Sequence, residues 1–136
     1  MKLSSLVFVV LIVVIINSCS SPPDIKGLWQ ADDWDCGSID FTKDLKYVKY
    51  ENSNTDLDNE PLDNGDVSLS ELEGRNCLIL ISNVFYDGSW AQNQAFSFEM
   101  PNENQMTLYG DKQKSDQCLD INSIEDLVKI NMTKIK

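Results

Sequence analysis

Histidine is absent from the 136-residue chain. Its absence removes the usual general base near neutral pH, and with it the Ser-His-Asp and Cys-His arrangements of hydrolases. Zinc sites also draw heavily on histidine, and a three-cysteine site would lack the fourth ligand that zinc usually takes. Carboxylates are plentiful, but nothing in the sequence brings two of them together in a cleft. We therefore expect a protein that is not an enzyme and that holds no metal or other cofactor.

Basic residues are scarce. Eleven Lys and Arg face 22 Asp and Glu, which gives a formal net charge of −11. A chain this acidic should not bind nucleic acid or anionic lipid through its charge. The excess of carboxylates suits a basic protein partner or a cation, and the simpler interpretation is a well-solvated, soluble surface.

The chain also lacks an apolar run long enough to cross a bilayer. The longest run, Leu6 to Ile16, has eleven residues, whereas a spanning helix needs about 20. A single positive charge, Lys2, precedes the run. This order of a charge and a short apolar stretch is typical of a secretory signal peptide.

The end of the run, Ile16-Asn17-Ser18-Cys19, resembles the lipobox of bacterial lipoproteins. The resemblance implies cleavage before Cys19 and a diacylglycerol on its thiol. The chain then divides into a signal peptide (1–18), a lipidated tether (19–24) and one folded domain (25–136). Such a protein would sit in the cell envelope, on the outer membrane facing the periplasm or the cell surface. Ordinary cleavage near residues 18–20, which would leave a soluble secreted protein, is the alternative.

No segment after the signal has ten residues of helical period. Short stretches of alternating apolar and polar residues predict strands instead, separated by turns rich in Asn, Asp, Gly and Pro. The expected strands cover 25–31, 37–42, 46–51, 67–72, 77–81, 94–100, 105–109, 118–121 and 127–135. Residues 122–126 could form one helical turn. Eight or nine strands with mostly short connections predict an all-β fold, a single up-and-down antiparallel β-barrel.

Gly27-Leu28-Trp29, at the start of this series, resembles the first-strand signature of lipocalins and of the small lipocalin-like lipoproteins common in Bacteroidetes. The stretch 96–110, FSFEMPNENQMTLYG, is similar to a later hairpin of those proteins. The resemblance implies that Trp29 plugs one end of the barrel and that Gly27 lets a neighbouring segment approach closely. The long helix of larger lipocalins is missing, so the cup could be shallow or filled.

The chain has four cysteines, and three remain for pairing if Cys19 carries lipid. Export implies an oxidising compartment, so the remaining three predict one disulfide and one free thiol. In a meander of nine strands, Cys36 and Cys118 lie at one end of the barrel and Cys77 at the other. We therefore expect a Cys36–Cys118 disulfide and a free, buried Cys77.

A lipocalin-like barrel suggests a small apolar ligand, held among inward-facing side chains. The residues expected to contact it are Ile39, Phe41, Val48, Phe96 and Phe98. Trp90 lies in a polar stretch, where a large aromatic side chain is either a binding residue or a lid over the barrel end. The alternative function is an envelope inhibitor or immunity-type protein whose acidic surface binds a basic partner.

Two acidic stretches are candidate binding sites. Asp32-Asp33-x-Asp35 could bind a sugar or cation at the barrel rim, but the preferred interpretation is a solvated loop. Asp56, Asp58 and Glu60 have the spacing of a calcium loop, but the sixth position is proline and the twelfth is valine, where such loops carry glycine and glutamate. We therefore expect no metal site.

Overall fold

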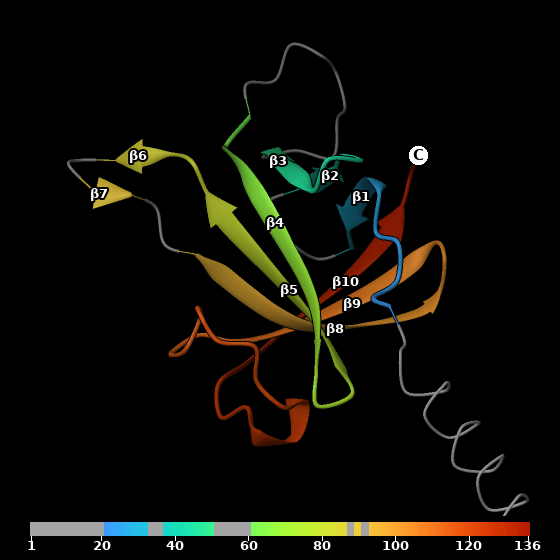
Figure 1. The fold of residues 1–136 in the computed structure, drawn as a ribbon, viewed down its shortest axis with the longest axis vertical. Helices are drawn as coiled ribbons and strands as arrows, with labels where there is room; N and C mark the ends of the chain where they lie inside the picture. Colours follow the sequence, from blue (N-terminus) through green and yellow to red (C-terminus); the bar gives the residue numbers. More distant parts are fainter. Residues whose placement is uncertain (1–20, 33–36, 51–60, 87–88, 91–92) are drawn as a thin grey trace, which may run out of the picture.

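The computed structural model describes residues 21–32, 37–50, 61–86, 89–90 and 93–136. These residues form a closed barrel of antiparallel strands in the order β1-β10-β9-β8-β5-β4-β3-β2, which confirms the predicted all-β, up-and-down architecture with eight strands in the barrel (Figure 1). The barrel strands are β1 (Gly27–Ala31), β2 (Ser38–Phe41), β3 (Lys46–Tyr50), β4 (Asp63–Leu72), β5 (Arg75–Ser82), β8 (Gln94–Asn102), β9 (Gln105–Asp111) and β10 (Leu127–Lys134).

Three details differ from the expected strands. β6 (Phe85–Tyr86) and β7 (Ser89–Trp90) pair with each other in a separate two-stranded sheet. β4 begins at Asp63, four residues before the strand expected at 67–72. Residues 118–121 are not a strand, because β9 and β10 already pair directly from Asp111↔Leu127 onward and leave no place between them. A short 3-10 helix, η1 (Ile121–Ser123), follows instead, with Asp120 as its N-cap.

The two ends of the barrel are built differently. At one end, which we call the turn end, the strands are joined by short turns at 42–45, 73–74 and 103–104. At the other, the loop end, the strands are joined by longer connections, which in sequence are 32–37, 51–62, 83–93 and 112–126. In Figure 1 the β6–β7 hairpin extends to the left, and the segment that begins at Ser21 lies on the right.

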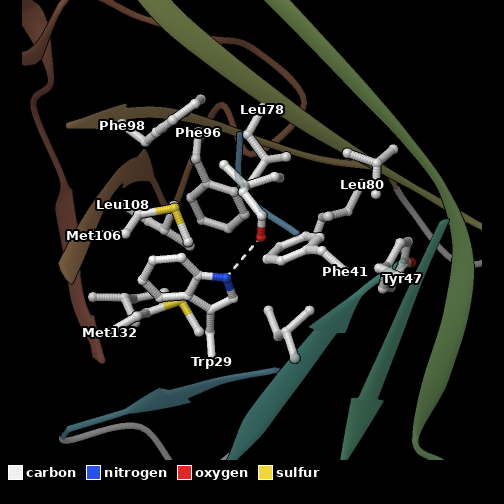
Figure 2. Close-up of a cluster of buried hydrophobic side chains, with 14 of the residues drawn as sticks. Trp29, Phe41, Tyr47, Leu78, Leu80, Phe96, Phe98, Met106, Leu108 and Met132 are labelled. Carbon is white, nitrogen blue, oxygen red and sulfur yellow. Dashed lines mark hydrogen bonds between the residues drawn. The ribbon is translucent and has the colours of Figure 1, made fainter. Parts of the chain in front are cut away.

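Trp29 fills the interior near the turn end. Its ring is fully buried, and its indole nitrogen donates a hydrogen bond to the carbonyl of Ile25 at 2.7 Å. Figure 2 shows the ring between Met106, Met132 and Phe41. Lys134 places its ammonium group 5.7 Å from the ring centroid. The barrel is therefore packed with side chains at this end, as the lipocalin-like resemblance implied for Trp29.

Gly27 permits the close approach that completes this packing. Its φ is +121°, and a Cβ there would lie 2.3 Å from the carbonyl oxygen of Lys136. Leu28 donates its backbone N–H to that same oxygen at 3.0 Å. Any side chain at Gly27 would displace the end of the chain from β1, so the expected role of this glycine is confirmed.

Four of the predicted inward residues belong to the core. Ile39, Phe41, Phe96 and Phe98 are all at least nine-tenths buried, and they pack in one apolar cluster. The inward placement of Val48 is wrong. The burial pattern of β3 alternates the other way, so that the residues on either side of Val48 are the buried ones.

Residues 112–126, which we call the strap, cross the outer face of β8 and β5 (Figure 1). The hydroxyl of Ser97, on β8, donates to the carbonyl of Leu119 and lies 3.3 Å from the sulfur of Cys118. Arg75, at the start of β5, lies 3.8 Å from the carboxylate of Asp120. The strap therefore covers side chains that would otherwise face solvent.

The predicted Cys36–Cys118 disulfide is wrong. Cys118 is joined to Cys77, with their Cα atoms 5.9 Å apart. The prediction treated 118–121 as a barrel strand, whereas this stretch is part of the strap and passes over β5. Cys77 is only 3% exposed, so its burial is confirmed, but it is not free. Cys36 lies outside the described residues.

Candidate functional site

Polar side chains collect inside the barrel at the loop end. Asp63, at the start of β4, accepts hydrogen bonds from the hydroxyl of Tyr47 at 2.7 Å and from that of Ser82 at 2.5 Å. These three residues come from three neighbouring strands. Burial, followed by the hydrogen bond to Asp63, raises the pKa of Tyr47 well above its ordinary value. Tyr47 therefore stays protonated, and remains a donor to Asp63, throughout the physiological pH range.

Lys49 adds a positive charge to the same interior. It is 7% exposed, and its ammonium group donates to the side-chain oxygen of Gln94 at 3.2 Å. Lys49 pairs in register with Asp63 on β4, and Gln94 pairs with Leu80 on β5. The loop end thus carries polar groups across the width of the barrel, whereas the interior near Trp29 is apolar.

A pocket of about 240 Å³ opens beside this polar group. It forms where β8 and β9 diverge: their last pair towards the loop end is Ser97↔Tyr109. Beyond it, Ala95 donates its N–H to the carbonyl of Ser115 in the strap. The lining residues are Gln94, Ala95, Phe96, Gly110, Asp111, Lys112, Ser115, Val128 and Ile130. Its walls are mainly apolar, and its polar residues stand at the strap and beside Lys49.

Gly110 creates part of this space. It is buried on β9, and a Cβ at this position would lie 3.1 Å from the ring of Phe96. The glycine occurs where the inward alternation of Met106 and Leu108 would otherwise place a third apolar side chain. The missing side chain leaves the ring of Phe96 as one wall of the pocket.

Asp111 holds both ends of the strap. One carboxylate oxygen accepts the backbone N–H groups of Gln113 and Lys114, and the other accepts those of Glu125 and Asp126. The hydrogen bond from Gln113 is the main cause that lowers the pKa of Asp111 below its ordinary value. Because Lys112 and Ser115 belong to the strap, Asp111 also fixes that wall of the pocket.

The predicted ligand residues divide between the core and the pocket. Only Phe96 lines the pocket, whereas Ile39, Phe41 and Phe98 lie in the packed interior. Val48 is partly buried on the outer side of β3. Trp90 belongs to β7 rather than to a loop, and its side chain lies outside the described part of the structure.

Several sequence expectations fall outside the described residues: Cys19, Cys36, Asp33, Asp35, Asp56, Asp58 and Glu60. Asp32 is described, and it accepts a hydrogen bond from Thr133 on the exposed surface. Within the described residues there is no group of three or more Cys, Asp or Glu side chains placed to hold a metal ion.

Sequence reasoning missed the residues that shape the loop end: Lys49, Asp63, Gln94, Gly110 and Val128. For Lys49 a signal existed, because alternation in KYVKYE allows either Tyr47 and Lys49 or Val48 and Tyr50 to face inward. The single aliphatic residue favoured the wrong choice. For Gly110 the signal is a glycine that interrupts an inward series, which can indicate a space as well as a turn.

Among the described residues, no helix combines the length and apolar character needed to cross a bilayer. No family model matches the chain, and no curated protein or solved structure shows significant similarity to it.

Proposed function

We propose that this chain is a lipid-anchored, lipocalin-like protein of the cell envelope that binds a small, mainly apolar ligand at the loop end of its barrel. The proposal is of a binding protein and not of an enzyme. Cys19 would carry the diacylglycerol, and residues 25–136 would carry the binding site.

The observation that carries the ligand proposal is the pocket beside Phe96. The interior around Trp29 is filled by the apolar core, whereas β8, β9 and β10 leave apolar side chains uncovered in this recess of about 240 Å³. Ligand pockets are commonly apolar with a few polar groups that orient the ligand. Gln94 and the strap residue Ser115 supply such groups here.

Filling the pocket tests the proposal. Gly110→Val adds a side chain against Phe96 and should lower affinity for a neutral apolar fluorophore such as N-phenyl-1-naphthylamine at least about tenfold, since the ligand and the new methyl groups would occupy the same volume. Thr107→Val is the matched control, because Thr107 lies three residues earlier on β9 and is only partly buried. Fluorescence titration measures both variants, with thermal unfolding to establish that each is folded. Equal affinity for the parent and Gly110→Val would contradict the pocket as the binding site.

Native mass spectrometry of the protein purified from its own host would identify the ligand. We expect a co-purifying small molecule on the parent and its loss from Gly110→Val. Intact-mass analysis of the same sample tests the anchor, because lipidated Cys19 adds the mass of its acyl groups and Cys19→Ser does not. A parent of unmodified mass would contradict the anchor while leaving the pocket open to test.

A second candidate function is the binding of a basic protein. The exposed charged side chains of the strap are more often acidic than basic, with Asp116, Asp120 and Glu125 against Lys112 and Lys114. Binding steered by these charges would weaken steeply as salt rises, whereas binding of an apolar ligand would not. A co-purifying basic protein that dissociates in salt would favour this second function.

A further inference from the structure

We infer that the turn end of the barrel rests on the membrane, with the exposed side chains of Leu45 and Leu72 in contact with lipid, and that the pocket faces away from the bilayer. The inference rests on the proposed lipid at Cys19, because that anchor fixes where the chain meets the membrane. What it adds is the orientation of the domain and the residues that touch lipid.

The first step is the course of the N-terminal segment. Ser21 and Pro23 line a recess together with Glu71, Gly74, Asn76 and Met100, so this segment lies against the β4–β5 turn. Ile25 is 2% exposed and belongs to the core. The expected tether 19–24 is thus packed against the barrel from Ser21 onward.

The second step is reach. Two peptide units separate Cys19 from Ser21, and they span at most about 7 Å, given about 3.6 Å for each extended residue. A lipid on Cys19 therefore holds the surface around Ser21 close to the headgroups. Ser21 lies at the turn end, so the turn end is the part of the barrel that the anchor brings to the bilayer.

The third step is the presence of exposed leucines there. Leu72 is 48% exposed at the end of β4, and Leu45 is 46% exposed in the 42–45 turn. Leu45, Asp24, Ile25 and Lys26 line one small recess, so this turn also borders the N-terminal segment. Leu45 has a φ of +54°, a conformation that favours glycine or asparagine over leucine. The barrel leaves nearly half of this leucine side chain exposed to solvent. Contact with lipid would bury that apolar surface and so stabilise the bound domain.

Tryptophan substitution with brominated lipids tests the orientation. The full chain is produced with its own signal and reconstituted into vesicles of phosphatidylethanolamine and phosphatidylglycerol, with or without bromine on the acyl chains. Leu72→Trp reports on the turn end. Leu127→Trp is the matched control, because Leu127 is also 48% exposed but begins β10 at the loop end. The fluorescence added by each substitution is measured relative to the parent.

We expect bromine to quench the emission added by Leu72→Trp and to leave that added by Leu127→Trp unchanged. Equal quenching of both, quenching of Leu127→Trp alone, or quenching of neither would overturn the orientation, provided that intact mass shows lipid on Cys19 and that the protein floats with the vesicles. If Cys19 carries no lipid, the proposed anchor fails and the orientation falls with it. Mass and flotation thus separate a failed anchor from a failed orientation.

Discussion

The turn end and the loop end are made from the same eight strands but are filled by different chemistry. Near the turn end, Trp29, Met106 and Met132 pack tightly, and the polar indole nitrogen is satisfied by a backbone carbonyl. At the loop end, Asp63 and Lys49 point inward and bind other side chains. The difference suggests that the turn end supplies the stability of the domain, while the loop end leaves room and polar groups for recognition.

Removing Trp29 should have the largest effect, because it empties the centre of the apolar end. Trp29→Ala is expected to lower the free energy of unfolding by about 3–5 kcal/mol, from lost burial and a cavity. Urea unfolding measures this loss. Leu127→Ala, at an exposed apolar site, should change stability by less than about 0.5 kcal/mol. A small effect of Trp29→Ala would remove the contrast between the two ends.

Removing the disulfide should have the next largest effect. Cys77 and Cys118 are 41 residues apart in sequence, and the paired substitution Cys77→Ala with Cys118→Ala should cost about 2–4 kcal/mol on the chain-entropy account. Cys36→Ala serves as the control, since it leaves that disulfide intact. Denaturation of all three proteins under oxidising and reducing conditions measures the effect. A loss of stability in Cys36→Ala equal to that of the paired variant would contradict the Cys77–Cys118 pairing.

Asp63→Asn tests the polar end. Tyr47 and Ser82 donate to different oxygens of Asp63. The amide replaces one of these oxygens by an NH2 donor, so one of the two hydrogen bonds is lost, and we expect a loss of about 1–3 kcal/mol in the free energy of unfolding. Asp66→Asn, which breaks an exposed ion pair with Lys46, should cost no more than about 1 kcal/mol. Chemical denaturation of the two variants gives the comparison. Equal losses would mean that the inward hydrogen bonds contribute no more than a surface pair.

The strap should respond to acid through Asp111. Its pKa is lowered in the folded chain from an ordinary 3.8, so its hydrogen bonds stabilise the fold above that value. The contribution is lost as pH falls from 3.8 through the lowered pKa of the folded state. The protection of the amides of residues 113–126 against hydrogen exchange, measured relative to the intrinsic exchange rate at each pH, should therefore fall in this acid range. In Asp111→Asn the same amides should exchange faster than in the parent at neutral pH and lose most of this acid response.

The barrel could be predicted because the alternation of apolar and polar residues within each strand identifies the face that points inward. In the stretch 96–110, the alternation of Phe96, Phe98, Met106 and Leu108 on either side of an Asn-rich turn predicts a hairpin with one apolar face, and all four are buried. The first strand, with Gly27 and Trp29, was recognisable for the same reason: the features that matter lie within three residues of each other.

The candidate site could not be predicted because it depends on contacts between distant strands. Tyr47 faces inward rather than Val48, since its ring occupies space beside Gly65, where a Cβ would lie 3.0 Å from that ring. The pocket exists because β8 and β9 stop pairing and the strap bonds to Ala95 in place of β9. No local sequence pattern identifies which strand pairs with which, or the residue at which the pairing between two strands ends. The same applies to Cys118, whose position over β5 follows from the path of the strap.

Closure of the barrel joins β1 to β10, with Trp29 opposite Lys134. Trp29 and Lys134 are more than 100 residues apart in the sequence. Closing the barrel therefore requires contacts between distant parts of the chain, and contacts of this kind slow folding. A chain still being synthesised exposes an unpaired edge on β1 until Leu127–Lys134 is available to pair with it. Edges of this kind can pair with other chains. Pairing of the last strand therefore removes this edge from a newly made chain, and deletion of β10 should yield aggregates rather than a smaller barrel.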